Sequence, residues 1–190
     1  LSLFVLTGQG ELASSLPANV QLLNKEYDMC SVHSKEGRSL LLKKIFKSLF
    51  MKGNIIMLLP YLVKNTCRMV KNKRFLPEKI MWRVLADGAE VFDNTYDLAV
   101  AYIEGGAAYY VARHVKAKRK IAFLHIDFNL AGYSRMLDED CYLQFDKVYA
   151  ISQEVRDTFE NVYPECKSKT ELFNNIINPM TRGKIAYQRI

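Results

Sequence analysis

The chain has 190 residues, of which 49% are hydrophobic, 12% aromatic and 25% charged, and its formal net charge is +7. A chain of this size and composition can bury the core of one domain, and it is too apolar for an intrinsically disordered protein. The longest apolar run, Ile55–Val63, contains Pro60 and is far shorter than the roughly 20 residues that span a bilayer. We therefore expect no membrane-spanning segment.

The four cysteines and three histidines show no pattern of a metal site. Cys30, Cys67, Cys141 and Cys166 contain no Cys-x-x-Cys pair and have no metal-ligand spacing to the histidines. We expect no metal, no disulfide and reduced thiols, as in a cytoplasmic protein. We also expect no cofactor within this chain.

The first half of the chain combines two strand patterns with three helical ones. Short apolar and β-branched runs ended by turn residues predict strands at Leu1–Thr7 and Val20–Leu23. From Ser39 onward the apolar residues recur with helical spacing. We expect one helix that begins near Ser39 and is broken at Gly53-Asn54. A second helix is expected at Ile55–Lys71, with Pro60 in its first turn or at a kink. A third is expected at Glu78–Ala86, after Pro77.

Strands and helices alternate regularly after Asp93-Asn94. The expected strands are Leu98–Tyr102, Ile121–His125, Lys147–Ile151 and Thr170–Asn174, and the expected helices are Ala107–Val115, Ser134–Phe145 and Gln153–Val162, the last with Ser152 as N-cap. Strands joined by helices of about ten residues form parallel sheets through right-handed crossovers. The sequence therefore predicts a three-layer, Rossmann-like α/β domain with a mostly parallel sheet.

One segment carries the whole positive excess. Gly37–Pro77 contains ten of the 27 basic residues and none of the 20 acidic ones, so the rest of the chain is slightly acidic. This charge pattern indicates an anionic partner, and the candidate contact residues are Lys43, Lys44, Lys47 and Lys52. The segment lacks the aromatic stacking pattern of single-strand binders and any DNA-binding motif, so we do not expect nucleic acid.

The basic segment has two interpretations. In one, it lies on an anionic membrane with its apolar stripe facing the lipid, since basic residues near such a surface each contribute about 1 kcal/mol. In the other, the stripe formed by Leu41, Leu42, Ile45, Phe46, Leu49 and Phe50 packs on the sheet while the lysines face water. We expect the stripe to pack on the sheet, because a parallel sheet is covered on both faces, and we leave the role of the lysines open.

Polar and small residues follow two of the predicted strands. Ligands of open α/β sheets bind outside the carboxyl ends of the strands, so Glu104, Gly105, His125 and Asp127 are the candidate binding residues. His125 either donates a hydrogen bond to a ligand or bonds a neighbouring carbonyl. Asp127 either accepts from a ligand hydroxyl or caps the next turn. Glu104 and Gly105 either contact a ligand or form a plain strand-to-helix turn.

Several segments, in order, resemble a known family. The runs YDLAVAYIEG, KIAFLHID, FDKVYAISQEVRDTFENVYPE and LFNNIINP, together with the opening LFVLTGQGELASSLPANVQLLN, are similar to the N-terminal, acceptor-side domain of bacterial GT-B glycosyltransferases of the large retaining family 4. The resemblance covers most of the chain and is weakest across Ser39–Ala86. It implies an acceptor-binding Rossmann-like domain over 1–178, and an interdomain linker and the start of a C-terminal, donor-binding domain over 179–190.

The resemblance also implies a function. The full-length protein should transfer a sugar from a nucleotide-sugar donor to a saccharide or lipid-linked acceptor in surface polysaccharide assembly, as a hexosyltransferase. It implies that His125, Asp127, Glu104 and Gly105 face the acceptor, but it assigns no catalytic residue in this half. We expect the isolated fragment to be inactive, and the full-length protein to be cytoplasmic and peripheral at the inner face of the cell membrane. The donor and acceptor sugars are not encoded in these residues.

A second hypothesis belongs to a different class. The chain would then be a non-catalytic α/β module whose basic face binds an anionic membrane or polymer. The transferase hypothesis requires a second, nucleotide-binding domain, whereas this one does not.

Overall fold

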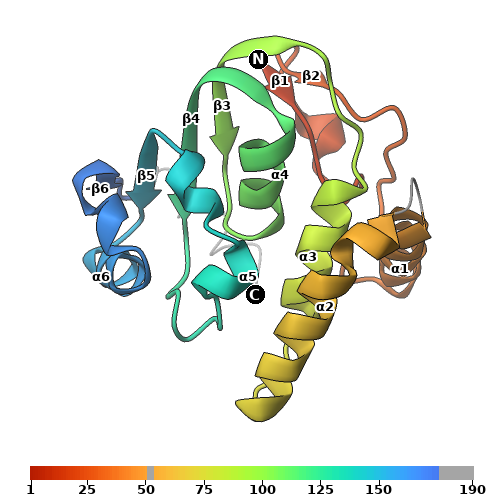
Figure 1. The fold of residues 1–190 in the computed structure, drawn as a ribbon. Coiled ribbons are helices and arrows are strands. Elements are labelled where there is room, and N and C mark those ends of the chain that lie inside the picture. The colour runs from red at the N-terminus through yellow and green to blue at the C-terminus, as the bar shows by residue number, and fades with distance from the viewer. Residues whose placement is uncertain (51–53, 176–190) are drawn as a thin grey trace, which may run out of the picture.

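The computed structural model describes residues 1–50 and 54–175 and shows an α/β protein with parallel strands in two sheets (Figure 1). The larger sheet has the order β3-β4-β5-β6 and the smaller one pairs β1 with β2. The strands are β1 (Ser2–Leu3), β2 (Gln21–Leu22), β3 (Thr95–Ala101), β4 (Lys116–Leu124), β5 (Lys147–Ala150) and β6 (Thr170–Leu172). The predicted parallel α/β class is confirmed.

Helices connect the strands of the larger sheet and also form a separate group before it. They are α1 (Lys35–Phe50), α2 (Asn54–Lys71), α3 (Pro77–Asp87), α4 (Gly106–His114), α5 (Arg135–Asp138) and α6 (Gln153–Val162), with 3₁₀ turns at Ala13–Ser15, Cys141–Gln144 and Pro164–Lys169. Ser152 caps α6 as predicted, because its hydroxyl accepts the backbone N–H of Val155. Pro60 lies inside α2 and not in its first turn.

Side chains on the larger sheet alternate between a buried face, covered by helices, and an exposed face. On the helix-covered face, Ala101, Ala122, Leu124, Val148 and Ala150 are fully buried. On the opposite face, Leu98, Val100, Tyr102 and Phe173 are all more than 40% exposed. Within the described residues the second helical layer of the predicted three-layer arrangement is therefore not seen.

The three helices α1, α2 and α3 form their own small core. Ile45, Leu58, Val84 and Leu85 are buried together there. Only Ile45 of the predicted α1 stripe is buried, while Leu42, Phe46 and Phe50 are exposed. The expectation that this stripe packs on the sheet is wrong, because α1 packs on α2 and α3 instead.

The predicted helix Ser134–Phe145 is also wrong as one continuous element. It breaks at Glu139 and Asp140, whose backbones are left-handed with φ of 46° and 56°. The break allows α5 and the following 3₁₀ turn to bury different side chains in the main core, among them Asp138 and Tyr142. The predicted interdomain linker and domain start at 179–190 lie outside the described residues.

An ion-pair junction connects the helical group to the sheet domain. Arg83 of α3 bonds Asp87 at 2.7 Å and also pairs with Glu139, which accepts from Arg113 of α4 at 2.8 Å. His114 at the end of α4 lies 2.8 Å from Asp87. The side chains of Arg83 and Asp87 are only 12% and 15% exposed, while that of Glu139 is 40% exposed. The junction is therefore mostly shielded from solvent.

No single helix in residues 1–50 and 54–175 is long and apolar enough to cross a membrane. Taken together, α1 and α2 reach the required length only as a bent pair.

Candidate functional site

The carboxyl ends of β3 and β4 lie next to each other, as predicted, because Ala101, the last residue of β3, pairs with Ala122, which precedes the end of β4 at Leu124. Glu104 is 6% exposed, and its Oε2 accepts the backbone N–H of His125 at 2.9 Å. Glu104 therefore ties the two strand ends together. Gly105, next to it, has a φ of +75° and precedes α4, a conformation that favours glycine.

The His125 ring retains a free nitrogen. It forms an aromatic cluster with Tyr102, 5.4 Å away between centroids, and Phe123, 6.4 Å away, which also contact each other. Its Nδ1 is 4.0 Å from Oε2 of Glu104, buried, and without a hydrogen bond. Since the side chain is 23% exposed, a ligand at this edge of the sheet can reach the ring.

Asp127 and Tyr133 organise the loop that follows β4. Asp127 Oδ1 accepts the backbone N–H of Leu130 at 2.7 Å, which is the turn-capping contact considered above. The Tyr133 ring is buried, lies under the ammonium of Lys79 at 4.3 Å, and has its hydroxyl against Gly105. Burial raises the pKa of Tyr133, as does the nearby Glu104. Tyr133 therefore stays protonated and connects the strand ends to the loop.

A cavity of about 210 Å³ lies beyond Tyr133, between the end of α2 and the loop after β4. Arg68 and Arg74 line one side, and Asn129, Tyr133 and Ser134 line the other. Nη1 of Arg68 is 3.4 Å from the Ser134 hydroxyl. Arg74 donates to the carbonyls of Asn129, at 3.1 Å, and Leu130. The remaining lining residues are Asn65, Met69, Asn72, Leu76, Gly132 and Leu137.

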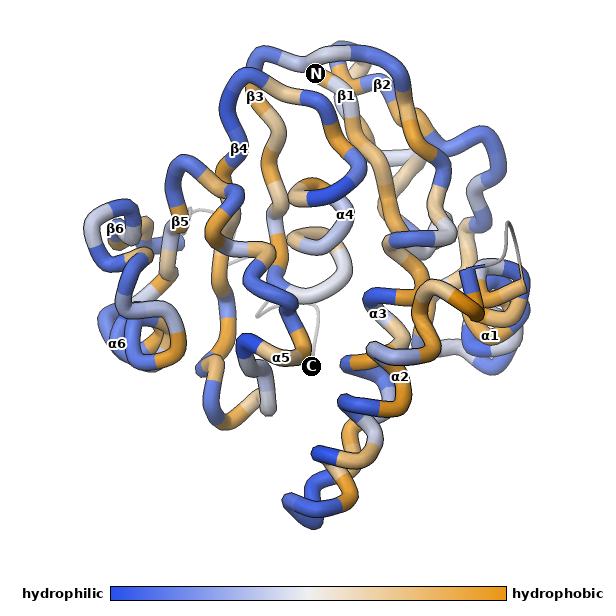
Figure 2. The backbone as a smooth tube through the Cα atoms, in the orientation of Figure 1, coloured by the Kyte–Doolittle hydropathy of each residue, from blue (hydrophilic) through white to orange (hydrophobic). Residues whose placement is uncertain are grey.

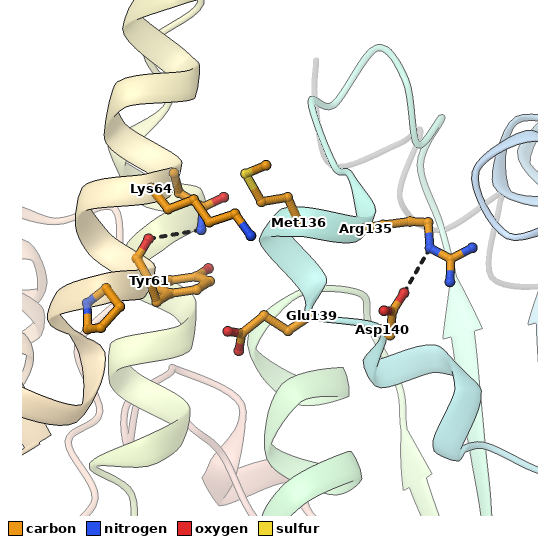
Figure 3. A pocket seen from close by; sticks show the side chains of 8 residues that line it. Tyr61, Lys64, Arg135, Met136, Glu139 and Asp140 are labelled. Atoms are coloured by element: carbon orange, nitrogen blue, oxygen red, sulfur yellow. Dashed lines mark hydrogen bonds and ion pairs between the residues drawn. The ribbon is translucent and has the colours of Figure 1, made fainter.

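A larger cavity of about 470 Å³ adjoins the first, and Asn65 lines both. Figure 3 shows Tyr61 and Lys64 of α2 facing Met136 and Glu139 across it. Arg135 and Asp140 also line it and bond each other at 2.8 Å. Two basic residues, Lys64 and Arg135, and two acidic residues, Glu139 and Asp140, line the larger cavity, so its formal charge is balanced.

The exposed sides of α1 and α2 each carry a row of apolar residues with lysines beside it. Figure 2 shows hydrophobic residues along these helices as well as in the strands. We call these two rows together the α1–α2 face. Its exposed apolar residues are Leu42, Phe46 and Phe50 of α1 and Ile56, Leu59, Val63 and Val70 of α2. These residues recur at spacings of three, four and seven, so each helix presents one continuous stripe.

The predicted lysines lie differently around the α1–α2 face. Lys43 and Lys47 are exposed and neighbour Phe46 along α1, and Lys64 and Lys71 are exposed on α2. Lys44 is partly buried with its ammonium beside Gly8, and burial lowers its pKa. Lys52 lies outside the described residues.

Among the described residues, no three His, Cys, Asp or Glu side chains gather in a group that would hold a metal ion, and all four thiols are free. The sequence did not predict the cavity residues Arg68, Arg74 and Tyr133 as a group. The two arginines were visible only as members of the basic segment, and their partner loop lies more than fifty residues away along the chain.

Comparison with known proteins adds no constraint, since no protein-family model, curated protein or solved structure matches the chain.

Proposed function

We propose that this chain is the acceptor-binding half of a glycosyltransferase that works on the surface of an anionic membrane and uses a lipid-linked acceptor. The observation that carries the proposal is that one helix, α2, contributes to both the exposed α1–α2 face and the two cavities at the carboxyl side of the sheet. A protein held on the membrane by this face has its cavities close to lipid headgroups.

The α1–α2 face has the composition of a membrane-binding surface. Phe46 and Phe50 are 59% and 68% exposed, and Ile56 is 76% exposed. Large contiguous apolar patches on a protein surface mark interaction sites, and apolar stripes flanked by lysines are typical of helices lying at a bilayer interface. The flanking lysines add electrostatic attraction to anionic lipid.

The transferase part of the proposal is supported by the resemblance and by the strand ends. Ligand sites of parallel α/β sheets lie at this edge, and the His125 side chain is 23% exposed there. The competing hypothesis, a non-catalytic module that binds anionic membrane, is favoured by the α1–α2 face alone. The two hypotheses differ in whether the edge with His125 binds a saccharide acceptor.

Membrane binding is tested by sedimentation with vesicles. We expect the protein to bind vesicles that contain phosphatidylglycerol and to bind phosphatidylcholine vesicles much more weakly. The double variant Lys43→Gln/Lys47→Gln should bind about 30-fold more weakly, because each lysine near the surface contributes about 1 kcal/mol. Arg119→Gln/Lys167→Gln is the matched control, since both residues are exposed and make no ion pair among the described contacts. Equal binding of the two variants would contradict the proposed orientation.

Sugar transfer is tested with the protein expressed from its complete reading frame. Membrane extracts are incubated with labelled nucleotide sugars, and lipid-extractable label is measured with the wild type and with His125→Ala. We expect label in the lipid fraction and a loss of most of it in the variant. Vesicle binding without any transferred label supports the non-catalytic module.

A further inference from the structure

We propose that the cavity lined by Arg68 and Arg74 is a phosphate-binding site, and that its ligand is the phosphate or diphosphate group of the lipid-linked acceptor. The identity of the ligand rests on the proposed function, whereas the recognition of phosphate rests on the cavity itself.

The charges of the cavity favour an anion. Of its lining residues two are arginines and none is acidic. Neither Arg68 nor Arg74 pairs with a carboxylate within residues 1–50 and 54–175, although most other arginines there do. A guanidinium without a carboxylate partner retains its full charge for a ligand, and its planar donor set matches phosphate oxygens bidentately.

The hydrogen bonds hold the two arginines in place without occupying all their donors. Arg74 is fixed by the carbonyls of Asn129 and Leu130, which places its guanidinium at the cavity wall beside Gly132. Arg68 makes only a long bond of 3.4 Å to Ser134. Each guanidinium has five N–H donors, so both arginines retain donors for an incoming group.

Neutral polar side chains complete the site. Asn72, Asn129, Ser134 and Tyr133 line the same cavity, and burial keeps the Tyr133 hydroxyl protonated. Leu76, which also lines it, immediately precedes α3, and no side chain caps the first turn of that helix. Since α3 begins with Pro77, which has no N–H, and carries Glu78 in its first turn, the positive charge of the site comes from the two arginines.

The size and position of the cavity suit a phosphate joined to larger groups. Its volume of 210 Å³ far exceeds the roughly 30 Å³ that one water molecule occupies. Asn65, which is 2% exposed, lines this cavity and the larger neutral one. A phosphate held by Arg68 and Arg74 therefore leaves the larger cavity for an uncharged saccharide.

The first test measures soluble anions in the absence of lipid. Inorganic phosphate and inorganic pyrophosphate are titrated into the whole chain by calorimetry. We expect saturable binding, tighter for pyrophosphate, and weakened about tenfold or more in Arg68→Gln, since hydrogen bonds to charged groups are the strong ones. Arg68 is exposed and its one bond is long, so the variant should fold; circular dichroism and the unfolding midpoint verify this. Arg74→Gln is the second variant and Arg119→Gln the control.

The second test distinguishes lipid-linked from free phosphate. Neutral phosphatidylcholine vesicles containing a prenyl phosphate are sedimented with the same proteins. We expect wild type to bind them, and Arg68→Gln to lose about the same factor as with pyrophosphate. Binding of pyrophosphate without binding of the prenyl phosphate vesicles restricts the site to soluble phosphates and overturns its assignment to a lipid-linked acceptor.

The phosphate site is refuted if pyrophosphate shows no saturable binding or if Arg68→Gln and Arg74→Gln both bind it like the wild type. Failure of the proposed function has a different signature. In that case the phosphatidylglycerol vesicles and the transfer assay give no signal, while binding of pyrophosphate remains dependent on Arg68.

Discussion

Asp138 offers a quantitative test of the core. Its carboxyl group is fully buried between Tyr109, whose hydroxyl donates to Oδ1 at 2.6 Å, and Tyr163, whose hydroxyl lies 3.4 Å from Oδ2. Burial raises the pKa of Asp138 from 3.8 to about 7, although both tyrosine hydrogen bonds act in the opposite direction. The substitution Asp138→Asn removes the ionisable group and retains an acceptor for Tyr109.

The pKa shift sets the size of the effect. A rise from 3.8 to about 7 means that ionised Asp138 destabilises the fold by roughly 4 kcal/mol, at about 1.4 kcal/mol per pKa unit. Because folding raises the pKa of Asp138, its contribution to the unfolding free energy is fully present below about pH 4, where the carboxyl is protonated in both states. This contribution is lost as the pH rises to about 7. Between pH 5 and 7 the wild type should lose about 2 kcal/mol of unfolding free energy relative to Asp138→Asn, and only about 0.4 kcal/mol more between pH 7 and 8.

Urea unfolding at several pH values measures this difference. Free energies of unfolding are determined for wild type and Asp138→Asn from pH 5 to pH 8, with equal m values as the check that only stability changes. Other titrating groups cancel in the difference between the two proteins. Asp157→Asn, at an exposed position, is the control and should show no such dependence on pH.

The reasoning about Asp138 is wrong if the difference in unfolding free energy between wild type and Asp138→Asn stays constant over this range. It is also wrong if the wild type gains stability relative to the variant as the pH rises, because that sign requires a carboxylate stabilised by folding.

Three further predictions concern single sites. Gly105→Ala should cost roughly 1–3 kcal/mol in urea unfolding, because φ is +75° there and a Cβ would lie 2.6 Å from the Tyr133 hydroxyl; an unchanged midpoint contradicts this. Gly88→Ala should also cost roughly 1–3 kcal/mol, since its Cβ would overlap Ser48 of α1, and stability equal to wild type would show that α1 can shift freely. Cys67 of α2 is exposed, whereas the other three thiols are partly or fully buried, so Cys67 should react first with a thiol reagent, and its reaction should slow down when anionic vesicles are added; reaction rates insensitive to vesicles argue against the α1–α2 face as the docking surface.

The sequence was most informative where periodicity and burial coincide. From β3 to β6 the order of elements was predicted correctly, and α6 has the predicted bounds, because short runs with apolar residues mark the strands and Ser152 is a strong N-cap. The adjacency of Glu104 and His125 also followed from parallel pairing. These features depend on local pattern and on one general rule of sheet topology.

The errors arose where distant residues decide the outcome. The α1 stripe has the spacing of a core helix, and nothing in that spacing shows that α3 occupies the inner position. The break at Glu139 depends on core contacts of Asp138 and Tyr142 with residues far along the chain. The phosphate cavity joins Arg68 and Ser134, which are 66 positions apart. A single sequence does not encode such pairings in a readable form.

The ion-pair junction around Arg83 has a geometric consequence for the proposed function. Ion pairs among Arg83, Asp87, Glu139 and Arg113 join α3 to α4 and to the end of α5, so they connect the helical group to the elements beside the strand ends. With the α1–α2 face on a bilayer, as proposed, this connection would set the height of the cavities above the lipid. The proposed transferase would then select its acceptor partly by reach: only a lipid whose phosphate sits at that height would enter, whatever its sugar.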